Sequence, residues 1–170
     1  MHPAEIGRAL ESMVILVDTR EQETPAFRAR VRAFGEWRRE KLDAGDYSAE
    51  FTLPDLGAVR VPAAVERKMD FTELANCYCQ QRARFRREFE RAKAAGVKIY
   101  LLVEGESWEK AYSGKYRSRM EPKALVASML SWLARYDCQI LMCKPETSGQ
   151  LIRDVLYREG REMMERMDSG

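Results

Sequence analysis

The chain lacks the residues that several common kinds of site require. Its 170 residues include one histidine, His2, which lies at a terminus where side chains are rarely held in place, so histidine-based catalysis has no candidate. No apolar stretch approaches the roughly 20 residues that span a bilayer, and the start of the chain lacks the basic and apolar regions of a signal peptide. We therefore expect a cytoplasmic protein that contacts no membrane.

Zinc sites and phosphate-binding loops also lack their patterns. The chain has four cysteines, Cys77, Cys79, Cys138 and Cys143. Neither the first two nor the last two have the spacing of a zinc finger. We expect reduced thiols instead, as in a reducing compartment. The Gly114-Lys115 pair is not a phosphate-binding loop, because Tyr116 stands where Ser or Thr is required and no glycine stands five residues before Gly114.

Charge of one sign is not in large excess. The 29 Lys and Arg residues and 27 Asp and Glu residues give a net charge of +2, so any nucleic-acid surface must be a local patch. A chain of 170 residues, 45% of them hydrophobic, suffices for one core but not for two ordinary domains. We predict a single domain over 1–170, with its core at about 13–143 and a C-terminal helix at about 148–167.

Hydrophobic periodicity predicts an α/β organisation. Three apolar runs rich in β-branched residues end in an acidic residue, at 13–18, 61–66 and 97–104, as buried strands of an α/β sheet do. Ligand sites of such sheets lie beyond strand ends, so carboxylates should converge there. We predict strands at 13–18, 37–43, 47–53, 59–68, 97–103 and 138–143, and helices at 4–12, 25–34, 71–95, 122–136 and 148–167.

The most informative feature is an aspartate in a turn, Asp46, followed by a strand that ends in Glu66-Arg67-Lys68. Side chains alternate faces along a strand, so Glu66 and Lys68 point the same way and Arg67 points oppositely. If the hairpin brings Asp46 beside Glu66, two hard oxygen ligands for Mg²⁺ lie next to a lysine. These groups suit phosphodiester hydrolysis. An isolated Glu-x-Lys is more often solvent-facing, but the converging carboxylates favour a site.

These residues carry a family resemblance. The segments 17–21 (VDTRE), 45–47 (GDY) and 65–68 (VERK) resemble the signature of the XPF-type nuclease domain, also called the excision-repair cross-complementation group four domain, of the PD-(D/E)XK superfamily. The resemblance continues in Arg84-Phe85 and in 99–104, so it spans about 13–143. It implies a restriction-endonuclease-like core, with a central mixed sheet flanked by helices. The chain is most similar to the stand-alone forms of bacteria and phages.

The resemblance implies a metal-dependent endonuclease that acts on DNA, with branched, flapped or forked duplexes preferred and DNA repair or recombination as the setting. We expect Mg²⁺, for which Mn²⁺ substitutes, to be held by Asp46, Glu66 and the backbone carbonyl of Arg67. Asp18 is a further expected ligand, direct or through water. Lys68 would orient the attacking water and, with a pKa lowered by desolvation, help to deprotonate it.

Arg20 and Glu21 are expected to support this site by ion pairing. Two positions depart from the family pattern: Thr72 stands where an aspartate is usual, and Glu88 stands where a glutamine is common. We predict that the nearby Asp70 caps the following helix and has not moved into the catalytic role.

Two basic segments are candidate DNA contacts. Arg84, Arg87 and Arg91 form a stripe at i, i+3 and i+7 of a helix, where arginine forks match phosphate oxygens. The alternative for the stripe is a solvated face with ion pairs to neighbouring glutamates. The second segment is a basic loop with interleaved aromatics, in which Lys115, Arg117 and Arg119 could follow a DNA backbone. An ordinary exposed loop is an equal alternative.

Two other functions stay open at this point: a non-catalytic DNA-binding or dimer-partner domain of the same fold, and a metal hydrolase of small phosphate esters. The last helix bears an apolar stripe that predicts a homodimer, unless the stripe closes the core. Its residues are Leu151, Val155, Leu156, Met163 and Met167.

Overall fold

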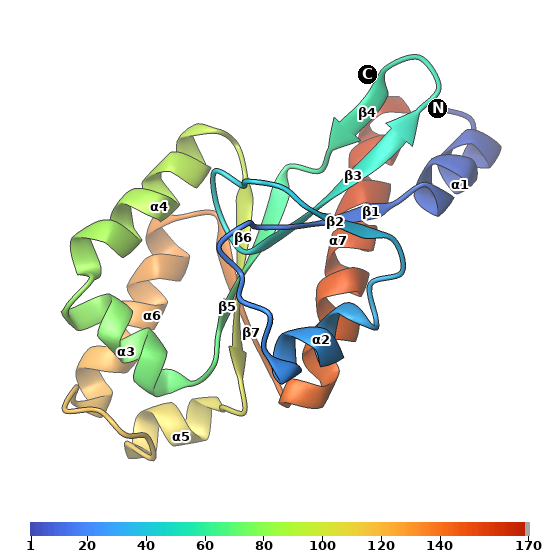
Figure 1. Ribbon diagram of the computed structural model, residues 1–170. Helices are drawn as coiled ribbons and strands as arrows, with labels where there is room; N and C mark the ends of the chain where they lie inside the picture. Colours follow the sequence, from blue (N-terminus) through green and yellow to red (C-terminus); the bar gives the residue numbers. More distant parts are fainter. Residues whose placement is uncertain (169–170) are drawn as a thin grey trace.

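The computed structural model describes residues 1–168 (Figure 1). The helices are α1 (Pro3–Glu11), α2 (Pro25–Val31), α3 (Phe71–Cys79), α4 (Arg82–Ala94), α5 (Trp108–Ser113), α6 (Pro122–Arg135) and α7 (Pro145–Asp168). The strands are β1 (Val14–Val17), β2 (Trp37–Arg39), β3 (Tyr47–Leu53), β4 (Gly57–Arg60), β5 (Ala63–Lys68), β6 (Lys98–Glu104) and β7 (Cys138–Cys143).

The strands form one mixed sheet in the order β2-β1-β3-β5-β6-β7, with β4 paired to β3. Strands β5, β6 and β7 run parallel, while β3 runs antiparallel to both β1 and β5. Contact between β3 and β5 is short, with Tyr47 opposite Val65 as their one registered pair. The sheet therefore brings the start of β3 beside the end of β5, where the candidate carboxylates lie.

Helices cover both faces of the sheet (Figure 1). On one face, buried residues of α1, α2 and α7 pack in a cluster with β1, β3 and alternate residues of β5. On the other face, α3, α4, α5 and α6 pack against the remaining β5 and β6 residues around the buried Trp132. This arrangement confirms the predicted α/β class with a central mixed sheet flanked by helices. Residues 1–168 contain no helix of the length and apolarity needed to cross a membrane.

The prediction of one strand over 59–68 is wrong. The chain forms β4 up to Arg60 and β5 from Ala63, and Pro62 stands between them. Proline has no amide hydrogen to donate to a ladder, so it interrupts a strand. Its carbonyl accepts a hydrogen bond from Lys98 N–H (3.0 Å), which begins the pairing with β6.

The single helix expected over 71–95 is in fact two, α3 and α4. Neither Gly nor Pro marks the break, and the apolar stripe continues across it in the same core cluster. At the break the amide of Gln81 donates to the carbonyl of Asn76 (3.2 Å), five residues back, which widens the last turn of α3.

A short helix, α5, replaces the first half of the expected basic loop. Ser107 caps its start by accepting a hydrogen bond from Lys110 N–H (3.2 Å). Trp108 and Tyr116 pack against the core beneath α6, whereas Tyr112 is exposed. The rings of Trp108 and Tyr116 are therefore already used in packing against the core.

The last helix begins at Pro145, three residues before the predicted start, and mainly closes the core. Leu156 and Met163 are buried in the cluster of α1 and α2, and Leu151 and Val155 pack partly against it. Met167 is exposed. The homodimer stays a prediction, because most of the stripe is already covered.

Asp70 caps α3, as predicted. Its Oδ1 accepts a hydrogen bond from Glu73 N–H (2.9 Å), and Glu73 Oε2 accepts one from Met69 N–H (2.7 Å). The two side chains thus satisfy amide groups at the start of the helix and place negative charge at its positive end.

We expect Asp70→Ala to lower the free energy of unfolding by about 1 kcal/mol, because the cap is lost, and Asp70→Asn to leave it nearly unchanged. Urea denaturation measures both. Cleavage of DNA by Asp70→Asn should be near that of the wild type. Lost cleavage with an unchanged unfolding midpoint would show that Asp70 serves the active site instead.

Candidate active site

The turn before β3 is tied to the strands on either side of it. The backbone N–H of Asp46 donates to the carbonyl of Val65 (2.8 Å), and its carbonyl accepts from Asp18 N–H (2.9 Å). The carboxylate is held as well, because Asp46 Oδ2 accepts from the backbone N–H of Arg67 (2.8 Å). Asp46 thus lies where β1, β3 and β5 meet.

Only glycine fits the position before Asp46. Gly45 has a φ of +76°, which side-chain-bearing residues rarely adopt, and a Cβ there would lie 2.8 Å from Ala64 Cβ and 3.1 Å from Val65 O. The absence of a side chain allows the turn to lie directly against β5. The glycine of the Gly-Asp pair is therefore required for a steric reason.

Glu66 and Lys68 share one face of β5, as the alternation predicted. Lys68 Nζ donates to Glu66 Oε1 at 2.7 Å, and both side chains are buried. Lys68 Nζ also lies 5.4 Å from the centre of the Phe85 ring on α4. Arg67 points to the opposite face, where it meets Glu104.

Asp46, Glu66 and Lys68 line one cavity of about 220 Å³ between β5 and the α3–α4 pair. Arg20 and Glu21 line it from the segment after β1, and Arg84 and Glu88 line it from α4. The structure thus gathers most of the predicted site around one cavity. The sequence marked Glu88 as a departure from the family pattern and as an ion-pair partner of the arginine stripe, and the structure adds that it lines the cavity as a further acidic group.

The cavity has an excess of negative charge held away from bulk water. Burial raises the pKa of Asp46 well above its usual value, and the charges of Glu66 and Glu21 raise it further. Burial also raises the pKa of Glu66, although Lys68 acts against the shift. Burial disfavours the Lys68 ammonium, but the neighbouring Glu66 carboxylate outweighs this and raises the pKa of Lys68. In the metal-free site the pKa of Lys68 is thus raised, and the lowering expected beside a bound metal ion stays a prediction.

The residues present fit a hard divalent cation. Asp46 Oδ1 and Glu66 Oε2 accept no hydrogen bond from any residue of the described chain, whereas the other oxygen of each carboxylate does. A cation would offset the charge that raises both pKa values. No group of three or more His, Cys, Asp or Glu side chains within 1–168 is arranged to hold a metal ion. Two carboxylates suffice for Mg²⁺, which is usually bound by one or two, together with water and phosphate oxygens.

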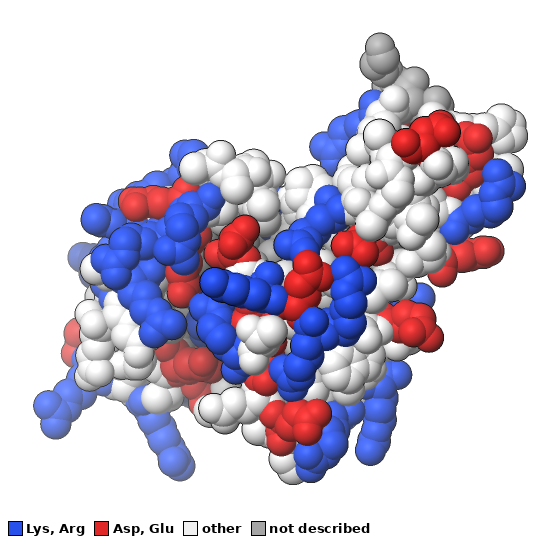
Figure 2. Space-filling model, turned by 45° about the horizontal axis from the view of Figure 1, so that its top comes forward, with Lys and Arg blue, Asp and Glu red and all other residues white. Residues whose placement is uncertain are grey.

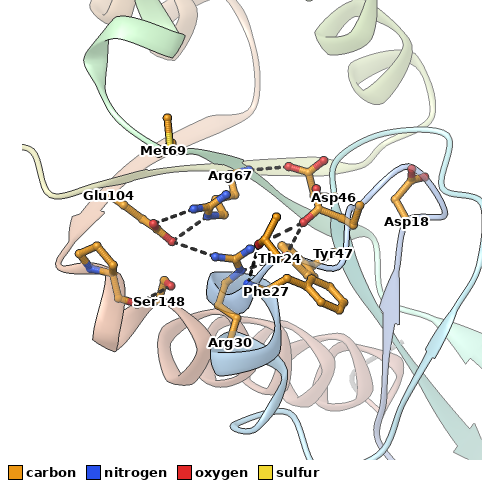
Figure 3. A network of polar contacts seen from close by, with 12 residues as sticks. Asp18, Thr24, Phe27, Arg30, Asp46, Tyr47, Arg67, Met69, Glu104 and Ser148 are labelled. Carbon is orange, nitrogen blue, oxygen red and sulfur yellow. Dashed lines mark hydrogen bonds and ion pairs between the residues drawn. The ribbon is translucent and has the colours of Figure 1, made fainter.

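A direct ligand role for Asp18 does not agree with its contacts. Asp18 Oδ1 accepts from the backbone N–H and the Nε of Arg20 (2.9 and 2.7 Å), and Oδ2 accepts from Leu42 N–H (2.8 Å). Figure 3 shows the side chain of Asp18 beside that of Asp46, with no contact drawn between the two carboxylates. Both oxygens are therefore engaged, and Asp18 positions Arg20 and the segment that leads to the Gly-Asp turn. A contact with the metal ion through water stays a prediction.

A network of hydrogen bonds and ion pairs lies on the face of the sheet opposite the cavity (Figure 3). It was not predicted from the sequence. Arg67 donates to both oxygens of Glu104 (2.7 and 2.8 Å), and Arg30 of α2 lies 3.5 Å from the same carboxylate. Arg30 Nε also donates to the Tyr47 hydroxyl (3.0 Å), which donates to Glu21 Oε2 (2.7 Å). This network holds Glu21 at the cavity from the opposite face of the sheet. It provides a structural basis for the supporting role predicted for Glu21.

The predicted basic residues lie in separate places. Arg84 lines the cavity and lies 3.7 Å from Glu88 in an ion pair. Figure 2 shows Lys and Arg side chains gathered on the side of the molecule where α4 lies. Exposed side chains of this stripe and of the α5–α6 connection are Arg84, Arg87, Arg91, Lys115, Arg117 and Arg119. Arg119 lines a groove along α3 and does not line the cavity.

Known structures place this architecture in a class. XPF from Aeropyrum pernix matches with a TM-score of 0.59 and 20% identity, over 84% of this chain and 59% of that one. XPF from Aeropyrum pernix in complex with DNA matches with a TM-score of 0.60 and 20% identity, over 88% and 66%. The chain thus spans less than two thirds of those proteins. The fold is that of the restriction-endonuclease-like nucleases.

Family membership follows from the sequence itself. Residues 17–154 match the ERCC4 domain. The chain therefore belongs to the ERCC4-domain family of structure-specific DNA endonucleases, whose members in general depend on divalent metal ions. A comparison with curated proteins finds no match. The bacterial or phage origin stays a prediction.

The close approach at Gly45 can be tested against a matched glycine. Gly35 also has a positive φ (+70°), but a Cβ there would meet nothing within 4 Å. We expect Gly35→Ala to cost about 1 kcal/mol of unfolding free energy through backbone strain alone. Gly45→Ala should cost about 1–3 kcal/mol more, because it displaces β5 or the turn, and DNA cleavage should fall with it. Equal losses in urea denaturation would show that the approach to Ala64 does not matter.

Proposed function

We propose that the chain is a Mg²⁺-dependent DNA endonuclease whose catalytic residues are Asp46, Glu66 and Lys68. The observation that supports this most is the pair of carboxylates with raised pKa values beside a protonated lysine in one cavity. Raised pKa values on converging acidic groups are typical of catalytic sites. Family membership supports DNA as the substrate, with branched or flapped duplexes preferred.

Asp46 and Glu66 would hold the metal ion, each through the oxygen that accepts no hydrogen bond within the described chain. When bound, Mg²⁺ supplies Lewis-acid polarisation of the phosphate and favours loss of a proton from water. The Arg67 carbonyl stays a predicted further ligand. Its backbone N–H has a separate function, because it fixes the direction of the Asp46 carboxylate.

Lys68 acts as a cation and hydrogen-bond donor, since its pKa is raised in the metal-free site. An ammonium at this place stabilises the negative charge that develops on the phosphate as water adds to phosphorus. The bond from phosphorus to the 3′-oxygen then breaks, which leaves a 5′-phosphate. Arg84, on the cavity wall and exposed, is placed to contact a phosphate oxygen of the strand.

We expect Glu66→Ala to abolish Mg²⁺-dependent cleavage and Lys68→Ala to reduce turnover by about 100-fold. Forked, flapped, duplex and single-stranded DNA should be compared, with DNA affinity measured in parallel. Lys123→Ala, which removes an exposed lysine on α6, is the matched control and should cut at the wild-type rate.

A wild-type protein that binds forked DNA but cuts none of the four substrates with Mg²⁺ or Mn²⁺ would contradict the proposal. It would favour a non-catalytic DNA-binding or partner domain of the same fold. Normal cleavage by Lys68→Ala would show that the assigned site is wrong.

A further inference from the structure

A second hollow lies beside the active-site cavity, between the segment before the Gly-Asp turn and the end of α4. Its volume is about 130 Å³, roughly the share of four water molecules in the liquid. It exists because the residues around it are small. Five alanines contribute to its lining: Ala44, Ala63, Ala64, Ala92 and Ala95.

The hollow and the active-site cavity are neighbours. A smaller space between them is lined by Ala44, which also lines the hollow, and by Glu66 and Glu88, which also line the active-site cavity. Ala44 lies two residues before Asp46, and Ala64 lies two residues before Glu66 on the same face of β5. The hollow therefore lies directly next to the active-site cavity along β5, within reach of the neighbouring nucleotide of a strand held there.

The charges at the hollow suit a nucleotide. Two arginines, Arg60 of β4 and Arg91 of α4, and one acidic residue, Asp43, contribute to the lining. Arg60 is ion-paired with Glu40, whereas Arg91 forms no ion pair with any residue of the described chain. A free guanidinium favours a phosphate.

The floor of the hollow is mainly apolar. Leu42 and Val61 are buried there beside the alanines, and the hydroxyl of Ser48 is already used, because it donates to Ala63 O (2.8 Å). A flat, uncharged group fits such a floor, and a phosphate does not. The combination of an apolar floor with arginines at the side matches one base with its phosphate outside.

We propose that this hollow is a base pocket that receives one unpaired base of the strand being cut, with Arg91 on an adjacent phosphate. The proposal rests on the proposed function, which brings the strand to Asp46 and Glu66. A base inside a duplex would have to leave its stack to enter, which costs free energy, whereas a base at a flap or fork junction is already free. The pocket would therefore contribute to the preference for branched DNA.

Removal of single bases tests the pocket with the wild-type protein. A forked DNA is prepared as a series in which an abasic site replaces one nucleotide at each position within several residues of the cut. Affinity is measured by fluorescence anisotropy with Ca²⁺ in place of Mg²⁺, so that binding is read without cleavage. We expect about tenfold weaker binding at one position next to the cut, since that base can no longer be buried, and little change at the others.

A variant with a larger side chain at the pocket is compared with a matched variant outside it. Both Ala94 and Ala95 are exposed, but only Ala95 lines the hollow, so Ala95→Leu places a larger side chain at its edge and Ala94→Leu makes the same change outside it. We expect Ala95→Leu to bind the intact fork about tenfold more weakly and to show no further loss at the sensitive abasic position. Ala94→Leu should behave as the wild type does. If Ala95→Leu does not fold, Arg91→Gln provides the second variant, with weaker binding of the intact fork expected.

The outcomes separate the pocket from the proposed function. Cleavage of the fork with no sensitive abasic position would overturn the base pocket and leave the endonuclease in place. A sensitive position that Ala95→Leu removes, in a protein that never cuts DNA, would support the pocket and overturn the endonuclease. A protein that binds no DNA would overturn both.

Discussion

The structure depends on the placement of one carboxylate. Asp46 is held by three hydrogen bonds, to Val65, Asp18 and Arg67, so that its side chain enters the same cavity as Glu66. This placement brings like charges together in a partly enclosed space, which raises the pKa of Asp46. The fold thereby maintains an arrangement that is unfavourable without a cation. A site of this kind has a physical reason to bind a divalent metal ion and a phosphate held by it.

Strand β5 connects the two faces of the molecule. On one face it presents Glu66 and Lys68 to the cavity, and on the other it presents Arg67 to the carboxylate of Glu104. The backbone of Arg67 holds Asp46 while its side chain is fixed in the buried network with Arg30. A buried ion pair of this kind adds little net stability, but removal of one partner is costly because the other is left buried and unpaired. The network therefore keeps β5 in place beneath the cavity.

Much of this could be predicted from short-range patterns. Period-two alternation placed Glu66 and Lys68 on one face. Of the three acidic ends of the apolar runs, only Glu66 lines the cavity. The cap at Asp70 followed from local chemistry. Predictions failed where distant contacts decide the outcome. Asp18 ends an apolar run like the other acids, but the register of β1 against β3 turns it toward Leu42.

Arg30 is a functional neighbour that the sequence did not single out. It reads as a surface arginine on a short helix, and it is buried only because α2 lies over Tyr47 and Glu104. No sequence signal marks the break between α3 and α4, which shapes the cavity wall. These features depend on packing between elements that are distant in the sequence. Neither composition nor hydrophobic periodicity predicts such packing.

The central claim is that the half-buried Asp46 and the buried Glu66 form a carboxylate pair that a divalent cation completes. The most direct measurement is the thermal unfolding midpoint of the wild type and of Asp46→Asn, each without metal and with added Mg²⁺. Because Asn keeps the shape and removes the charge, we predict a higher midpoint for Asp46→Asn without metal. Mg²⁺ should raise the midpoint of the wild type and leave that of the variant nearly unchanged. A less stable variant whose midpoint rises with Mg²⁺ as much as that of the wild type would contradict the account.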